Sequence, residues 1–138
     1  MGEHRSSVTG RPGQVRDPVY SAIIGLATLG VLLQGLWAGL FVREGEDFRA
    51  SWVEVHAIDG EVTILLALVA TVVAVVRMRR TRRDLVVGSA VFTVLLVVEA
   101  YIGGRIGSTA ALTAVHFPLA MALMGLAVWL PLRATRRG

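Results

Sequence analysis

Two histidines lie inside long apolar stretches, where an ionisable side chain is costly and calls for a partner. His56 lies roughly one helical turn into the second stretch and His116 roughly two turns into the fourth. Because the second and fourth helices of an up-down bundle run in the same direction, both imidazoles are expected at a similar depth. Two neutral imidazoles facing each other across a bundle are natural axial ligands of a haem iron. The pair therefore predicts a bis-histidine haem site.

Other polar and aromatic side chains are expected at the same level. The third stretch brings Glu99 and Tyr101, and the first brings Gln34 and Trp37. Gln34, Asp59 or Glu99 is suited to orient a histidine through its second ring nitrogen. The opposite half of each stretch offers only threonine hydroxyls, which can bond to the preceding helical turn. This asymmetry places the candidate chemistry at one end of the bundle.

Small and basic residues complete the predicted haem site. Gly60 and Ala120 each follow a histidine by one helical turn and would leave room for a flat macrocycle. Arg105 follows the third stretch and is placed to pair with a haem propionate. Pro118 removes a backbone donor close to His116 and frees the carbonyl of Ala114, so a bend is expected there.

The same layer permits other interpretations. Asp59 and Glu99 together with both histidines would suit zinc, manganese or iron, which gives a metal-binding or transport protein. Simple hydrogen bonding between helices is a further alternative. Movement of ions or protons has less support, because the other half of the bundle offers no ionisable relay. Glu61 points away from His56 on a helical wheel and is expected at the surface.

The elements that position these residues are four apolar segments, each near the roughly 20 residues that cross a bilayer as a helix. Short polar connections join them, so the fold class predicted is an all-α integral membrane protein, an antiparallel four-helix bundle. Residues 1–18 are expected to form a flexible tail and residues 133–138 a short second tail. The predicted spans are 19–42, 52–76, 85–104 and 109–132, with Ser108 as N-cap of the last helix.

The basic residues set the expected orientation. All 14 are arginines, and they flank the apolar segments. Eleven fall on the side of the two chain ends, against Arg43, Arg49 and Arg105 on the other side. By the excess of positive charge on cytoplasmic segments, both termini are expected in the cytoplasm of a cell-membrane protein.

Composition excludes several classes of protein. The chain has no cysteine, which rules out a disulfide, a thiolate metal site and a thioether-linked haem. No hydrolase triad or phosphate-binding glycine loop occurs at usable spacing. Because the arginines are explained by topology, no nucleic-acid partner is expected. The expected partner is the lipid bilayer, and a homodimer or a larger membrane complex is compatible with the Gly35-x-x-x-Gly39 pair.

Three segments resemble the haem A synthase family of membrane haem-binding proteins. VHFPLAMALMGLAVWL (115–130) is similar to the last helix of one four-helix half of that family, EAYIGG (99–104) to the end of the adjacent helix, and EVHA (54–57) to its first ligand position. The resemblance covers the membrane portion as one half-module and implies that His56 and His116 are haem ligands. The family joins two such units in one chain, whereas this sequence has one, so complete haem A synthesis is not implied.

The sequence as a whole predicts a membrane protein that binds haem b through His56 and His116 and serves electron transfer or haem handling. Such a chain would be a cytochrome b-like oxidoreductase or a haem-handling protein; no catalytic residue is assigned. The alternatives are a non-catalytic accessory subunit of a membrane complex and the metal-binding or transport protein described above.

Overall fold

The structure, a computed structural model, describes residues 16–43, 50–106 and 109–136. These residues form four long helices, α1 (Pro18–Arg43), α2 (Ala50–Met78), α3 (Arg83–Gly103) and α4 (Thr113–Thr135), and α4 follows a short 3-10 helix, η2 (Ala110–Leu112). The described segments contain no strand. Each of the four long helices is long and apolar enough to cross a membrane. The prediction of an all-α chain with four such helices is confirmed.

The helix ends differ from the predicted spans by a few residues. α2 continues to Met78 and α3 begins at Arg83, because arginine is a good helix former and its charged end can reach the polar surface beyond the apolar segment. α4 begins only at Thr113, since η2 occupies the preceding residues. The residue before the first turn of α4 is Leu112, with no side-chain capping bond. Ser108, the predicted N-cap, lies outside the described residues.

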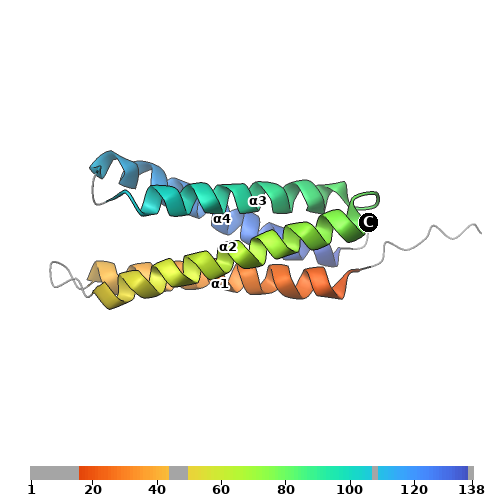
Figure 1. The fold of residues 1–138 in the computed structure, drawn as a ribbon, viewed down its shortest axis with the longest axis horizontal. Helices are drawn as coiled ribbons and strands as arrows, with labels where there is room; N and C mark the ends of the chain where they lie inside the picture. Colours follow the sequence, from red (N-terminus) through yellow and green to blue (C-terminus); the bar gives the residue numbers. More distant parts are fainter. Residues whose placement is uncertain (1–15, 44–49, 107–108, 137–138) are drawn as a thin grey trace, which may run out of the picture.

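The four long helices lie side by side along the long axis of the molecule (Figure 1). α1 and α3 each pack against both α2 and α4, so α2 and α4 lie diagonally opposite each other. Polar contacts fix the position of neighbouring helices along each other. Asp17, the residue before α1, pairs with Arg77 of α2, and Gln34 of α1 bonds to Asp59 of α2. Between α3 and α4, Asp84 pairs with Arg133 and Glu99 lies against His116.

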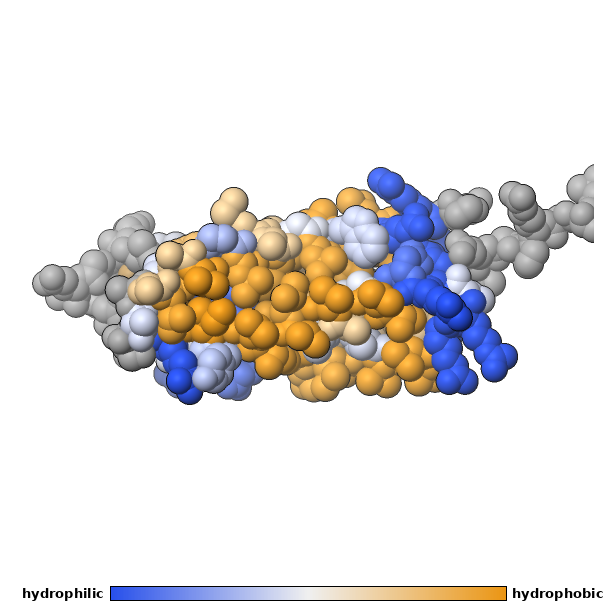
Figure 2. Space-filling model, turned by 90° about the horizontal axis from the view of Figure 1, so that it is seen from above, coloured by the Kyte–Doolittle hydropathy of each residue, from blue (hydrophilic) through white to orange (hydrophobic). Residues whose placement is uncertain are grey.

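The two ends of the bundle differ in charge. At the end where α1 begins and α4 finishes lie Arg16, Arg77, Arg79, Arg80, Arg82, Arg83, Arg133 and Arg136. Figure 2 shows hydrophilic side chains gathered at this end, next to a broad hydrophobic belt. We name it the arginine end and the opposite one, where α2 and α4 begin, the histidine end. Among the described residues, the histidine end carries only Arg43 and Arg105.

Each helix turns one stripe of residues toward its neighbours. The buried positions recur at steps of three and four residues, the spacing of knobs-into-holes packing. We call these positions the inward stripe: Tyr20, Ile24, Ala27 and Val31 on α1; Thr63, Ala67, Ala70, Ala74 and Met78 on α2; Leu85, Ser89, Phe92, Leu96 and Glu99 on α3; and Leu123, Ala127, Leu130 and Ala134 on α4.

Two glycines allow helices to approach closely. A Cβ atom on Gly30 would overlap the hydroxyl of Thr63, so α1 lies against α2 at a distance that only glycine permits. A Cβ atom on Gly88 would come 2.9 Å from Cζ3 of Trp129, which makes Gly88 the equivalent position between α3 and α4. Gly35 and Gly39, in contrast, have nothing within 4 Å of a Cβ position.

Hydroxyl groups satisfy polar backbone atoms inside the bundle. Pro131 lies inside α4 and has no N–H, which leaves the carbonyl of Ala127 without its helical donor. The Oγ1 of Thr28 on α1 donates to this carbonyl over 2.7 Å. The hydroxyl oxygens of Thr71 and Thr93 lie 2.9 Å apart, and each also lies within hydrogen-bond distance of a carbonyl on its own preceding turn, so two hydrogens serve three contacts. The expectation that threonines use the preceding turn is confirmed.

The close contact at Gly30 predicts that a larger side chain at this position destabilises the bundle. Replacing Gly30→Ala forces α1 and Thr63 apart, and we expect a loss of about 1–3 kcal/mol in the free energy of unfolding, the usual cost of overpacking. The measurement is denaturation of the purified protein in detergent, followed by circular dichroism. Gly25→Ala is the matched control, because the same change in the same helix meets nothing within 4 Å. Equal stability of the two variants would contradict the close contact.

Candidate functional site

The inward stripe continues to the histidine end, where its residues become polar. His56 precedes Thr63 by about two helical turns, and His116 precedes Leu123 by the same interval, so both histidines face the interior. Gln34 of α1 and Glu99 of α3 occupy the matching positions on the other two helices. All four helices therefore contribute polar side chains to one layer, as the sequence predicts.

His116 lies against α3. Its Nδ1 is 3.0 Å from Oε1 of Glu99, and its Cε1 would be 3.1 Å from a Cβ atom on Gly103. The two atoms are within ion-pair distance, although neither is part of a hydrogen bond. Both side chains are mostly covered, with 17% of His116 and 12% of Glu99 exposed. Gly103 therefore makes the room in which the imidazole meets the carboxylate.

His56 lies between α1 and the rest of the bundle. The ring of Phe41 meets its imidazole edge-on, with 5.5 Å between the ring centroids. Its Nδ1 is buried and has no hydrogen-bond partner. The two imidazoles come from diagonally opposite helices.

Gln34 joins α1 to the backbone and side chains of α2. Its Nε2 donates over 2.8 Å to the carbonyl of His56 and over 2.7 Å to Oδ2 of Asp59. Gly60 lies under the same amide, which would be 3.7 Å from a Cβ atom there. Gln34 thus holds the helix that carries His56, through its backbone and not through its ring. Asp59 accepts a hydrogen bond from the same amide. Of Gln34, Asp59 and Glu99, the three residues predicted to orient a histidine ring, only Glu99 lies beside a ring nitrogen.

Buried polar atoms without a hydrogen-bond partner gather at this end of the bundle. Within the described part of the chain they are Nε1 of Trp37, Nδ1 of His56, Oγ1 of Thr63, both carboxylate oxygens of Glu99 and Nδ1 of His116. Buried polar atoms in proteins nearly always have partners, so a concentration of such atoms points to a bound group or ion. The arginine half contributes no atom to this set.

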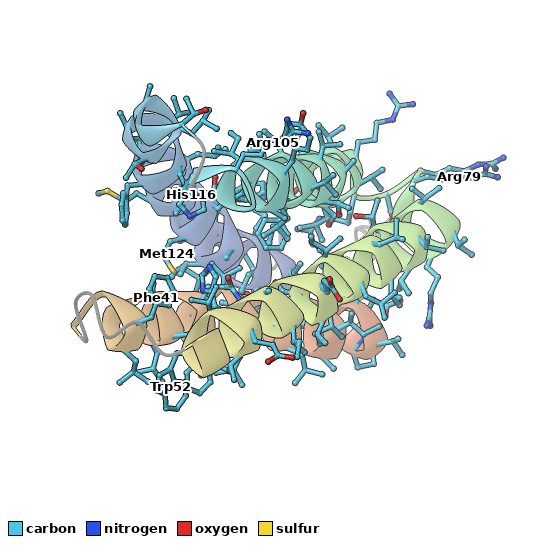
Figure 3. All side chains as sticks on the ribbon, turned by 60° about the vertical axis from the view of Figure 1, so that its left-hand side comes forward. Phe41, Trp52, Arg79, Arg105, His116 and Met124 are labelled. Carbon is cyan, nitrogen blue, oxygen red and sulfur yellow. The ribbon has the colours of Figure 1, made fainter. Side chains whose placement is uncertain are left out.

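The remaining predicted site residues lie around this layer. Ala120 is half-buried, one turn after His116. The guanidinium of Arg105 stacks on the ring of Tyr101, with its Cζ 4.3 Å from the ring centroid. In Figure 3, His116 and Phe41 lie at one end of the bundle and Arg79 extends from the other.

The metal alternative receives no support from the geometry. Among the described residues there is no group of three or more His, Asp or Glu side chains that could hold a metal ion. Glu99 stands beside His116, whereas Asp59 is held by Gln34. The four ligands that a metal site would need are thus not assembled.

Sequence reasoning missed two residues that shape this end of the bundle, Gly103 and Thr63. Gly103 was noted only within the segment EAYIGG (99–104), yet it packs on the imidazole of His116. Thr63 lies on the inward stripe at the level where the apolar packing ends, and the interval from His56 was a signal for it. Trp37 was expected at this level; its stacking on Trp52, with 5.6 Å between ring centroids, was not predicted.

Fold and site together define an all-helical protein with four helices long and apolar enough to span a membrane and a histidine and carboxylate layer at one end. Neither a family model, nor a curated protein, nor a solved structure matches the chain.

The Gln34 contacts predict a measurable coupling. Gln34→Leu leaves the Asp59 carboxylate without its donor, so we expect a loss of about 1–3 kcal/mol in the free energy of unfolding. Replacing both partners, Gln34→Leu with Asp59→Leu, should recover part of that loss because no polar group is then left unpaired. A double-mutant cycle in detergent measures this coupling. Strictly additive losses would show that the two side chains do not interact.

Proposed function

We propose that the chain is an integral membrane protein whose helices form an antiparallel bundle, with the arginine end in the cytoplasm. The apolar length of the four helices supports the membrane location. The contacts of Asp17 with Arg77 and of Glu99 with His116 support the antiparallel order. The excess of arginine at one end supports the orientation.

We further propose that the histidine end binds a b-type haem, with His56 and His116 as axial ligands. The observation that carries this proposal is the cluster of buried polar atoms at this end, in which Nδ1 of His56 has no hydrogen-bond partner and Nδ1 of His116 has the carboxylate of Glu99 beside it. The two imidazoles come from diagonally opposite helices, and both lie on the inward side of their helix. This arrangement is suited to hold a cofactor in the core of a bundle. The resemblance of segments 54–57, 99–104 and 115–130 to a haem A synthase half-module supports the same assignment.

The neighbouring residues would orient the ligands. A carboxylate beside the second ring nitrogen of a ligating histidine fixes the tautomer and the ring direction, a role that suits Glu99 next to His116. Gln34 would hold the backbone of α2 at His56, and Arg105 would pair with a propionate at the rim. A bound haem supplies one-electron exchange, so the protein would serve electron transfer or haem handling at the outer surface.

Absorption spectroscopy tests the haem proposal directly. We expect the protein purified in detergent to show a low-spin b-type spectrum on reduction with dithionite, and His56→Ala and His116→Ala each to abolish it. His4→Ala, which changes the remaining histidine of the sequence, is the matched control and should keep the wild-type spectrum. Pyridine haemochrome analysis gives the haem content. A colourless, well-folded wild type supplied with haem would overturn the assignment.

Glu99 gives a second, independent prediction for the same site. Glu99→Leu should weaken haem retention by about 10–100-fold, the usual effect of losing a group that orients a metal ligand. Glu99→Gln, which keeps a hydrogen-bonding group beside His116, should lose less. Glu61→Gln is the control, because Glu61 is an exposed carboxylate on the surface of α2. Haem transfer to apomyoglobin measures retention, and equal retention in all variants would contradict the role of Glu99.

A second candidate function is that of a non-catalytic accessory subunit of a membrane complex. The open positions of Gly35 and Gly39 favour it, because nothing among the described residues covers them and small residues allow another helix to approach. Absence of haem combined with stable association of a second membrane chain would favour this function over the first.

A further inference from the structure

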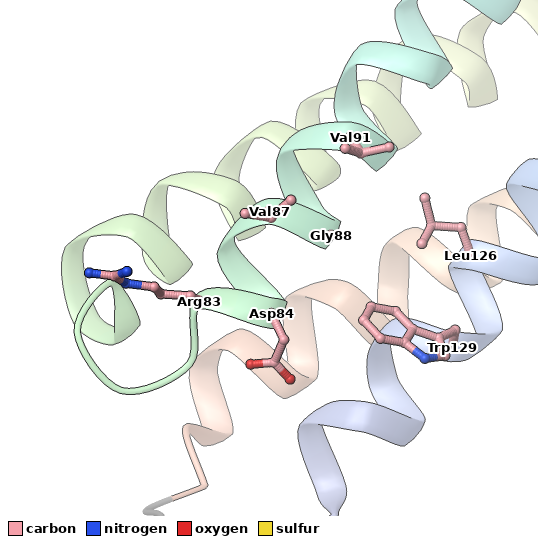
Figure 4. Close-up of a pocket in the computed structure, with 7 residues that line it drawn as sticks. All are labelled: Arg83, Asp84, Val87, Gly88, Val91, Leu126 and Trp129. Atoms are coloured by element: carbon pink, nitrogen blue, oxygen red, sulfur yellow. The ribbon is translucent and has the colours of Figure 1, made fainter.

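A groove with a volume of about 480 Å³ lies between α3 and α4 toward the arginine end (Figure 4). Its walls are Val87 and Val91 of α3 and Leu126 and Trp129 of α4, and Gly88 lies between them. The glycine lets the indole of Trp129 lie against α3. Val87 is 61% exposed and Trp129 is 42% exposed, so the groove opens on the outside of the bundle. In a membrane, this surface faces hydrocarbon.

Charged residues lie at the end of the groove nearest the start of α3. Arg83 and Asp84 line it. Oδ2 of Asp84 lies 2.7 Å from Nε of Arg133, and Oδ1 lies 3.3 Å from Nε of Arg82, so this carboxylate is already neutralised. Arg82 is 6% exposed and also donates to the carbonyl of Arg133 over 2.8 Å. Arg83 is exposed and makes no ion pair within the described part of the chain. Figure 4 shows its guanidinium extended away from Val87 and Trp129, so this charge lies beyond the end of the groove and not over its walls.

From this geometry we propose that the groove binds one anionic phospholipid of the cytoplasmic leaflet. The phosphate is held at Arg83, and an acyl chain lies along Val87 and Val91 with Trp129 beside it at the interface. Anionic lipids concentrate in the cytoplasmic leaflet, and tryptophan favours the boundary between headgroups and hydrocarbon. This inference rests on the proposed membrane orientation and is independent of haem binding.

The order of chemical groups along this surface favours a phospholipid over a protein helix. A single acyl chain is thinner and can follow an apolar groove along its length. The cation at one end and the apolar walls beyond it match the order of groups in a phospholipid.

Native mass spectrometry of the delipidated full chain tests the site. We expect phosphatidylglycerol to bind with one lipid per chain and more tightly than phosphatidylcholine. Arg83→Gln should weaken this binding about fivefold, the worth of one arginine at an anionic surface. Arg79→Gln is the charge-matched control, since Arg79 is exposed at the same end of the bundle and lies outside the groove. Equal weakening by the two variants would show diffuse attraction and overturn the site.

The acyl part is tested separately. Val91→Trp fills the groove and should abolish preferential binding, whereas Val94→Trp, on an exposed part of α3 outside the groove, should leave it unchanged. In a Trp37→Phe, Trp52→Phe background, phosphatidylglycerol with brominated chains should quench Trp129 fluorescence more than brominated phosphatidylcholine. Equal quenching by the two lipids, or no effect of Val91→Trp, would overturn the inference. A colourless wild type that still binds the lipid would remove only the haem proposal.

Discussion

The inward stripe, one face of each helix at steps of three and four residues, is the constraint on which the rest of the structure depends. Toward the arginine end the stripe is largely apolar, and its α2 part is small, with Ala67, Ala70 and Ala74, so the neighbouring helices can lie close to α2. Toward the histidine end the same stripe carries His56, Glu99 and His116. The same inward face of each helix therefore provides the packing of the arginine half and the residues of the proposed site in the histidine half.

The two halves treat buried polar groups differently. In the arginine half, Tyr20 and Ser89 join their hydroxyls over 2.8 Å, and Thr28 supplies the donor that Pro131 withholds from Ala127. These groups satisfy one another, as an apolar environment without water requires. At the histidine end, Glu99 and both imidazoles keep unpartnered atoms. This contrast supports a ligand-binding role for the histidine end more strongly than the presence of two histidines alone.

The arginine end combines two uses of charge. Arg82 and Arg133 converge on Asp84 and tie α3 to α4 where the helices leave the apolar belt. The Asp84 carboxylate neutralises part of the arginine charge through these ion pairs. Arg83 takes no part in them and is exposed. The same sequence RMRRTRRD, which reads simply as a topology signal, therefore contains residues with distinct structural positions.

The sequence by itself determined the four helices and the approximate position of each polar residue along its helix. Long apolar segments admit only helices where no water can satisfy the backbone, and counting along a helix places Glu99 near His116, as found at 3.0 Å. Only the tertiary structure decided that Gln34 binds the His56 carbonyl, that Gly30 meets Thr63 and that a groove opens beside Trp129. These contacts depend on how each helix is rotated and shifted against its neighbours. That rotation is set by the packing of all four inward stripes together, which no single segment of sequence contains.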